Sequence, residues 1–171
     1  MTADEHRRAA PAVLGFGILT VSDSRGALDD VSGRTLRDLV EASGHRIVDS
    51  TLVRDEVASI RAAIRRLLEM PEVDVVVTTG GTGFSPRDVT LDAAAPLLER
   101  PIEGFGELFR MLSYQQVGAA AMLSRAAAGV VGAKAVFLLP GSPKAAALAF
   151  EKLILPEAGH LLGQVRRPFT P

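Results

Sequence analysis

The stretch "VVVTTGGTGFSPRDVT", Val75–Thr90, runs from an apolar segment directly into a loop with three glycines within four residues. Its valines and threonines favour a strand, and the lack of polar alternation indicates burial on both faces. Glycine tolerates positive φ and leaves its backbone N–H uncovered, so the loop can hold an anion. A tight turn between a strand and a helix also explains the glycines, and the loop alone does not decide between the two interpretations.

Three further segments have the composition of buried strands, at residues 12–22, 46–53 and 135–140. Segments with helical periodicity lie between them, and the clearest spans residues 57–68 and is stopped by Pro71. Strands that are apolar on both faces and alternate with helices predict a mostly parallel sheet with helices on both sides. The sequence therefore predicts a three-layer α/β fold.

Local signals indicate where several helices begin and end. We expect helix N-caps at Ser32, Thr90 and Ser142, with Pro143 in the first helical position after Ser142. Gly44 stands where a helix would end.

The region after residue 100 is less regular than a simple series of strands and helices. We expect a helix over residues 105–118 and a hairpin turn over residues 132–134 that leads into the last strand. Several apolar residues of this helix are expected in the core or in a subunit interface rather than around a cofactor: Phe105, Phe109, Met111 and Leu112.

Length and composition limit the class of protein. The chain has 171 residues, a net charge of −1 and no cysteine. We expect one domain, residues 12–171, after a polar N-terminal tail at residues 1–11. Scattered basic residues give no indication of nucleic-acid binding, and the absence of cysteine excludes disulfides and thiolate catalysis. The longest apolar run, residues 12–21, is about half of the ~20 residues that a membrane helix needs. We therefore expect a cytoplasmic protein.

Three loops leave the carboxyl ends of the expected strands, at residues 22–30, 79–88 and 140–143. In open α/β sheets, ligands bind beyond these ends. The glycine loop and the helix start at Ser142 both suit an anion. Two such loops at one edge predict either a ligand with more than one phosphate or two phosphate sites.

Carboxylates accompany these loops. Asp88 follows the last glycine of the quoted stretch by five positions. A carboxylate beside a phosphate is repulsive unless a cation lies between them, and Mg²⁺ binds through one or two carboxylates plus substrate phosphates. Asp55 is a second candidate and Asp23 a third. Helix capping is the alternative role for Asp88 and for Asp55, and for Asp55 taken alone it is the more common one.

Other reactive side chains show no pattern typical of a site. No two of His6, His45 and His160 have the spacing of metal ligands. Ser22, Ser113, Ser124 and Ser142 have no His–Asp arrangement nearby in the sequence, which therefore gives little support for a serine nucleophile.

Five motifs in order resemble one known family. The chain is similar to the MoaB/MogA family of molybdenum-cofactor biosynthesis proteins from about residue 13 to about residue 162. The motifs are "TVSDSRGALDDVSG", "TTGGTGFSPRDVT", "EGFGELFRMLS", "MLSRAAAG" and "LLPGSPKA". One such motif is weak evidence, whereas five in register over one domain are strong evidence.

The resemblance implies a Rossmann-like α/β domain that assembles as a homotrimer or homohexamer. It implies a molybdopterin adenylyltransferase that uses ATP and Mg²⁺, transfers AMP to the terminal phosphate of molybdopterin and releases pyrophosphate. The product would pass to a molybdate-insertion enzyme. Some members resembling this branch have lost activity together with their aspartates, so a non-catalytic molybdopterin-binding or assembly protein is the alternative. The presence of both Asp55 and Asp88 favours an active enzyme.

The resemblance also implies a role for each matching residue. Asp88 and Asp55 would be catalytic and hold the metal, and Ser22 and Asp23 would lie on the nucleotide side. The residues expected to contact substrate are Thr79, Gly80, Gly81, Thr82, Gly83, Ser85, Ser113, Ser124, Gly141 and Ser142.

Overall fold

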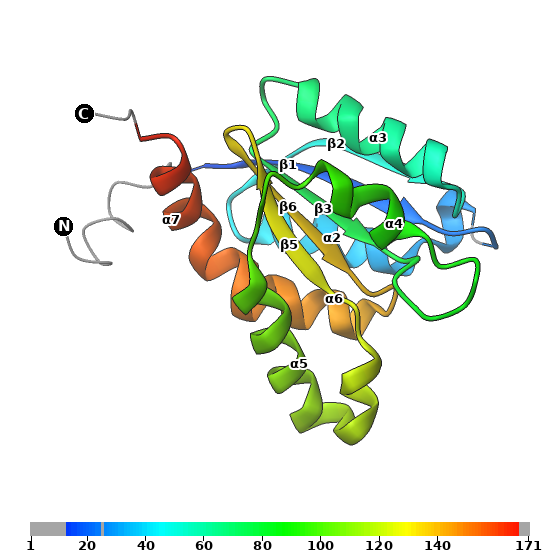
Figure 1. Ribbon diagram of the computed structural model, residues 1–171. Coiled ribbons are helices and arrows are strands. Elements are labelled where there is room, and N and C mark those ends of the chain that lie inside the picture. The colour runs from blue at the N-terminus through cyan, green and yellow to red at the C-terminus, as the bar shows by residue number, and fades with distance from the viewer. Residues whose placement is uncertain (1–12, 25, 168–171) are drawn as a thin grey trace.

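A computed structural model describes residues 13–24 and 26–167. The predicted tail, residues 1–11, and Ala12 lie outside the described residues. Six strands form one sheet in the order β2-β1-β3-β6-β5-β4 (Figure 1). The strands are β1 (Gly15–Val21), β2 (Arg46–Val53), β3 (Val75–Thr79), β4 (Arg100–Pro101), β5 (Ala127–Val131) and β6 (Lys134–Leu139).

The sheet is mostly parallel. Strands β2, β1, β3 and β6 pair in parallel, whereas β5 and β4 add an antiparallel edge. The antiparallel edge arises from the predicted hairpin, where Gly132 takes φ +55° between β5 and β6. The predicted fold class is therefore confirmed.

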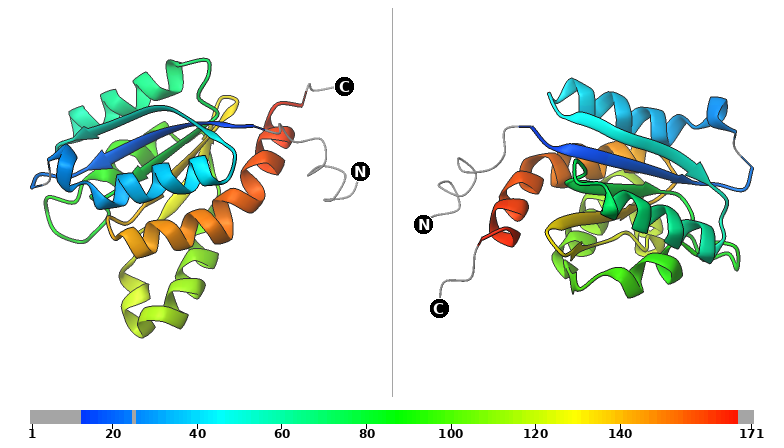
Figure 2. Two further views of the ribbon diagram at one scale, coloured as in Figure 1. Left: turned by 180° about the vertical axis from the view of Figure 1, so that it is seen from behind. Right: turned by 90° about the horizontal axis from the view of Figure 1, so that it is seen from above.

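Helices cover both faces of the sheet (Figures 1 and 2). Helices α3 and α4 pack on one face, and α2, α5, α6 and α7 contribute to the core on the other. The α-helices are α2 (Val31–Ala42), α3 (Val57–Glu69), α4 (Thr90–Ala94), α5 (Glu103–Val117), α6 (Pro143–Ala149) and α7 (Leu155–Val165). Shorter elements are η1 (Ala27–Asp29), η2 (Ala95–Leu97), η3 (Gly118–Leu123) and the π-helical turn η4 (Phe150–Ile154).

The central strands are apolar on both faces because each face is covered. In β1, Phe16 and Ile18 belong to the core on the α2 side, whereas Leu19 and Val21 belong to the core on the α3 side. Successive residues of a strand point to opposite faces, so a strand between two layers of helices needs apolar residues at both kinds of position. All seven residues of β1 are accordingly buried.

Two predicted N-caps are wrong and one is confirmed. Asp30, not Ser32, caps α2, and its carboxylate accepts hydrogen bonds from the Gly33 N–H and the Thr20 hydroxyl group. Thr90 is the first residue of α4, and Val89 is the N-cap residue; the Thr90 hydroxyl group instead donates to the carbonyl oxygen of Gly80 at 2.9 Å. Ser142 caps α6 as predicted.

The predictions for Pro143 and Gly44 are also confirmed, and the core prediction for α5 is confirmed in part. Pro143 is the first residue of α6, and Gly44 follows α2 with φ +77°. Phe105 and Phe109 of α5 are buried in the core, whereas Met111 is 55% exposed. Among the described residues, no helix is long and apolar enough to cross a membrane.

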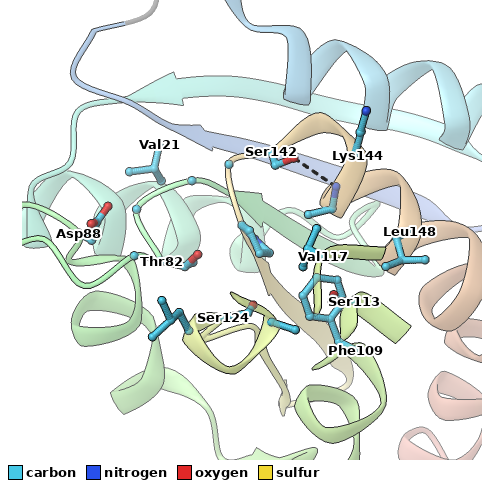
Figure 3. A pocket seen from close by; sticks show the side chains of 18 of the residues that line it. Val21, Thr82, Asp88, Phe109, Ser113, Val117, Ser124, Ser142, Lys144 and Leu148 are labelled. Atoms are coloured by element: carbon cyan, nitrogen blue, oxygen red, sulfur yellow. Dashed lines mark hydrogen bonds between the residues drawn. The ribbon is translucent and has the colours of Figure 1, made fainter. Parts of the chain in front are cut away.

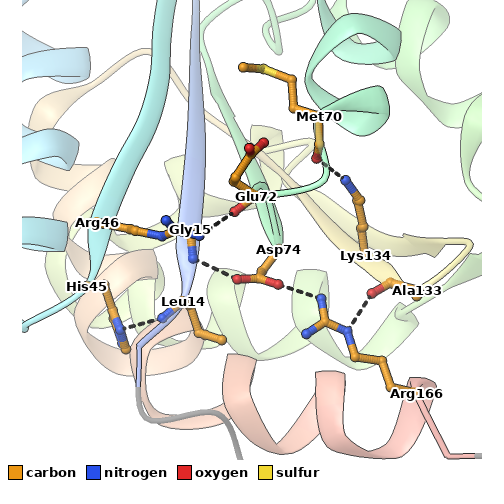
Figure 4. Close-up of polar contacts among 10 residues, drawn as sticks. All are labelled: Leu14, Gly15, His45, Arg46, Met70, Glu72, Asp74, Ala133, Lys134 and Arg166. Atoms are coloured by element: carbon orange, nitrogen blue, oxygen red, sulfur yellow. Dashed lines mark hydrogen bonds and ion pairs between the residues drawn. The ribbon is translucent and has the colours of Figure 1, made fainter.

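The amino-terminal edge of the sheet is closed by polar contacts (Figure 4). The Asp74 carboxylate accepts hydrogen bonds from the Gly15 N–H at 2.7 Å and from Arg166 at 2.6 Å. Arg166 also donates to the Ala133 carbonyl, and the Lys134 ammonium group donates to the Met70 carbonyl. These contacts join the end of α7 to the strand starts, and the opposite edge carries the cleft.

Candidate active site at the carboxyl edge of the sheet

A cleft of about 1260 Å³ opens beyond the carboxyl ends of the parallel strands. One wall is formed by the loops after β1, β2, β3 and β6, and the other by α5, η3 and α6. Figure 3 shows Asp88 and Thr82 on the loop side, with Ser113 and Phe109 of α5 across from them. This is the edge at which an open α/β sheet binds ligands.

Most predicted site residues line this cleft, although they come from six separate segments of the chain. They are Ser22, Asp23, Asp55, Gly80, Gly81, Thr82, Gly83, Asp88, Ser113, Ser124, Gly141 and Ser142. Thr79 and Ser85 do not line it. Thr79 is fully buried and donates its hydroxyl hydrogen bond to the Pro140 carbonyl at 2.8 Å, which joins the ends of β3 and β6. Ser85 lies in the exposed part of the loop and donates its backbone N–H to Asp88 at 2.9 Å.

The two principal carboxylates both lie against the glycine loop. A Cβ atom at Gly81 would lie 2.8 Å from Asp55 Oδ1, and one at Gly83 would lie 2.6 Å from Asp88 Oδ2. Side chains at either position would displace the acids, so the glycines are needed for close approach. Gly80 and Gly81 also take positive φ, +102° and +63°.

Neither acid caps a helix in the way that the alternative interpretation proposed. Glu56 is the N-cap residue of α3, whereas the Asp55 carboxylate accepts the Val89 N–H at 3.1 Å, in the loop before α4. The Asp88 carboxylate accepts the Ser85 N–H within its own loop. Each acid thus fixes the glycine-rich loop through one oxygen. Among the described residues, Asp55 Oδ2 and Asp88 Oδ1 receive no hydrogen bond.

The electrostatics of Asp55 suit a cation. Burial raises the pKa of Asp55 above its usual value, and the charges of Asp88 and Asp23 raise it further, against the effect of the Val89 N–H. Two crowded carboxylates with spare oxygens are hard ligands of the kind that Mg²⁺ prefers. In the part of the chain that the structure describes, no three acidic or histidine side chains form a metal cage. The donor set therefore fits an ion that is also held by ligand phosphates.

Asp23 differs from the other two acids. It forms an ion pair with Arg87 at 2.5 Å and accepts the backbone N–H of Asp55 at 3.1 Å. The Arg87 hydrogen bond and the Asp55 N–H lower the pKa of Asp23 below its usual value. The charge of Asp23 is thus already compensated, and it links the loop after β1 to the loops that carry Asp55 and Arg87.

Sequence reasoning missed three residues near the cleft. Arg87 and Lys144 line it, and Arg125 donates hydrogen bonds to carbonyl oxygens of the glycine-rich loop. Arg87 belongs to the stretch Val75–Thr90 and Lys144 follows Pro143, so their positions in the motifs could have indicated them as site residues. For Arg125 the only signal was its place beside Ser124.

The fold and the cleft define a class: an α/β protein with a cleft beyond the carboxyl ends of its parallel strands, next to paired acids. Residues 17–160 match the family described as "Probable molybdopterin binding domain". A relative from Bacillus cereus, "Molybdenum cofactor biosynthesis protein B", is 45% identical over 168 residues, which cover 98% of this chain and 99% of that protein. A Staphylococcus aureus protein of the same name is 48% identical over 153 residues, covering 88% and 90%.

Comparison with solved structures identifies the same family. A "Molybdenum cofactor biosynthesis protein B" superimposes with a TM-score of 0.89 at 46% identity, covering 93% of this chain and 99% of that one. The Pyrococcus furiosus "tungsten cofactor synthesizing protein MoaB" gives a TM-score of 0.83 at 36% identity, covering 92% and 100%. The chain belongs to the MoaB/MogA family of molybdenum-cofactor biosynthesis proteins.

Proposed function

We propose that the protein is a Mg²⁺-dependent molybdopterin adenylyltransferase. The supporting observation is that Asp55 and Asp88, from different strand ends, lie against one glycine segment in one cleft. Ser113 and Ser124 line the opposite wall. The cleft thus has an acidic, amide-rich side for a metal-bound nucleotide and a second side for another ligand.

In the proposed reaction, an oxygen of the terminal phosphate of molybdopterin attacks the α-phosphorus of ATP. The new P–O bond forms as the bond between the α-phosphorus and its bridging oxygen to the β-phosphate breaks, and pyrophosphate leaves. A bound Mg²⁺ would neutralise phosphate charge, with Asp55 and Asp88 as its protein ligands. The N–H groups of Gly81, Thr82 and Gly83 would bind phosphate oxygens, since the Gly80 N–H already donates to the Leu139 carbonyl, and the walls would align the two substrates.

The far wall suits a flat heterocycle. Phe109, Val117 and Leu148 provide apolar surface there, and the hydroxyl groups of Ser113 and Ser124 provide hydrogen bonds (Figure 3). A mostly apolar wall with a few polar groups is typical of small-molecule sites. We assign this wall to the pterin.

The direct test is incubation of the purified protein with ATP, Mg²⁺ and molybdopterin. We expect adenylylated pterin and pyrophosphate in equal amounts. Asp88→Asn should lower turnover by about 100-fold or more, because it removes charge at the metal. Asp38→Asn, in the exposed part of α2 outside the cleft, is the matched control and should leave turnover unchanged.

The alternative is a non-catalytic pterin-binding or assembly protein, and the same apolar wall is compatible with it. It predicts that molybdopterin binds, that no AMP is transferred at saturating substrates, and that Asp88→Asn has almost no effect. Calorimetric titration of molybdopterin with and without ATP separates the two functions. Binding of ATP without any binding of pterin would contradict both and indicate a general nucleotide-binding protein.

We further propose that the protein acts as a homotrimer or homohexamer and passes its product to a molybdate-insertion enzyme. Support for self-association comes from apolar side chains that α5 and η3 leave exposed: Leu108, Met111, Tyr114, Met122 and Leu123. Exposed apolar groups gathered on neighbouring elements are typical of interfaces. Sedimentation equilibrium tests this, and a monomer at micromolar concentration would contradict it.

A further inference from the structure

Arg125, two residues after η3, contacts the glycine-rich loop but does not line the cleft. Its Nε donates to the Thr82 carbonyl at 3.1 Å, and its Nη2 donates to the carbonyl oxygens of Gly83 at 2.5 Å and Asp88 at 3.0 Å. Its guanidinium carbon also lies 5.2 Å from the ring centroid of Phe84. The side chain therefore holds both ends of the loop, Thr82–Gly83 and Asp88, in one set of contacts.

These contacts suit a loop that binds anions. A backbone segment attracts phosphate only when its N–H groups face the ligand and its carbonyl oxygens are directed elsewhere. The planar guanidinium group can hold several carbonyl oxygens at fixed angles, and a charged donor makes these hydrogen bonds stronger than neutral ones. Lysine offers a single point charge and cannot reproduce the same geometry.

We propose that Arg125 is a positioning residue that keeps the Thr82–Asp88 loop, and with it the Asp88 carboxylate, in its anion-binding form. Arg125 does not line the cleft, so it acts through the loop rather than on the ligand. Its neighbour Ser124 does line the opposite wall. Two consecutive residues therefore connect the glycine-rich loop to the opposite wall of the cleft. The effect on AMP transfer rests on the proposed function, whereas the effect on the loop does not.

The test measures backbone amide hydrogen exchange in the ligand-free protein. The Ser85 and Asp88 amides are protected by hydrogen bonds within the loop, to Asp88 Oδ2 and to the Ser85 carbonyl. We expect Arg125→Gln to speed their exchange by about tenfold or more, because three carbonyl contacts are lost. Arg125→Lys keeps the positive charge but not the planar guanidinium group with its several donors, and should give an intermediate exchange rate. It also serves as the test variant if Arg125→Gln does not fold.

The matched control is Arg110→Gln. Arg110 donates to the Ser124 carbonyl but has no hydrogen bond to the glycine-rich loop among the described residues. It should leave the Ser85 and Asp88 amides unchanged. Unchanged amide exchange in both Arg125 variants would overturn the proposal, because it would show that Arg125 does not hold the loop. An equal increase in exchange in Arg110→Gln would also overturn it, because it would indicate a general loss of stability.

Catalysis gives a second and separate measurement. If the wild-type protein transfers AMP, Arg125→Lys should lower kcat by about tenfold while changing the KM for molybdopterin less than twofold, because the residue acts through Asp88. A rise in that KM with kcat unchanged would contradict the positioning role. An inactive wild-type protein refutes the proposed function, but the exchange experiment still decides whether Arg125 holds the loop.

Discussion

The carboxylate of Asp55 accepts a hydrogen bond from the backbone N–H of Val89 at 3.1 Å, although 34 positions separate the two residues in the chain. Val89 directly follows Asp88, so this bond joins the loop after β2 to the loop after β3. One oxygen of Asp55 therefore has a structural role, and the other is left for a ligand. Predictions about Asp55 must separate these two roles.

Substituting Asp55 by asparagine or by alanine separates its structural hydrogen bond from its role toward a ligand. Asp55→Asn removes the charge but keeps an acceptor for the Val89 N–H, whereas Asp55→Ala removes both. We expect both variants to lose AMP transfer. In urea unfolding at neutral pH, Asp55→Ala should be about 1 kcal/mol less stable than Asp55→Asn, because the N–H loses its partner. Equal unfolding free energies would show that the bond does not contribute to stability.

The stability of the folded chain should depend on the ionisation of Asp55. Burial raises its pKa in the folded protein above the usual 3.8, so the folded state holds the proton more tightly than the unfolded state does. The group's contribution to stability is then fully present below pH 3.8 and is lost as pH rises through the higher folded pKa.

The measurement is the unfolding free energy of wild type minus that of Asp55→Asn. We expect this difference to decrease as pH rises from below 3.8 into the range above it. Asp23 should show the opposite sign, since its pKa is lowered and its contribution is lost as pH falls. A difference for Asp55 that increases with pH would contradict the raised pKa.

Gly81 should be intolerant of alanine because of its surroundings as well as its backbone. Its φ is +63°, and a Cβ there would lie 2.3 Å from Thr90 Oγ1 and 2.8 Å from Asp55 Oδ1. Gly132 is the matched control, with φ +55° and nothing within 4 Å of its added Cβ.

We expect Gly132→Ala to lower the unfolding free energy by about 1–2 kcal/mol through backbone strain alone. Gly81→Ala should lower it by at least about 1 kcal/mol more, because crowded atoms must move, and should also weaken ATP binding. Urea unfolding and calorimetry measure these effects. Equal losses of unfolding free energy in the two variants would show that the crowded contacts at Gly81 do not contribute to the cost of the substitution.

Thr90 and Thr78 form a second matched pair, since both side chains are fully buried. The Thr90 hydroxyl group donates to the Gly80 carbonyl, whereas Thr78 Oγ1 has no partner among the described residues. Thr90→Val should destabilise the protein by about 1–3 kcal/mol, because it removes a buried hydrogen bond. Thr78→Val should be neutral or stabilising, and a similar loss in thermal unfolding for both would contradict this account.

Much of the fold could be predicted because its signals are local. Periodicity predicted α3 over residues 57–68, against Val57–Glu69 in the structure, and Gly132 marked the hairpin. The N-caps show where local signals fail. Ser32 has a suitable side chain, but Asp30 takes the role because it also reaches Thr20 of β1. Residue type alone does not reveal such a contact with a distant strand.

The sequence by itself determined the elements and the residue types at the strand ends: apolar strands, a glycine loop, and acids directly after them. These follow from burial and backbone conformation, which act over a few neighbouring residues. Only the tertiary structure decided that Asp55 binds Val89, that Thr90 binds Gly80 and that Arg125 holds the glycine-rich loop. The physical reason is that these contacts depend on strand order and on how the loops fold back across the sheet edge, and neither is set by the period or composition of any one segment.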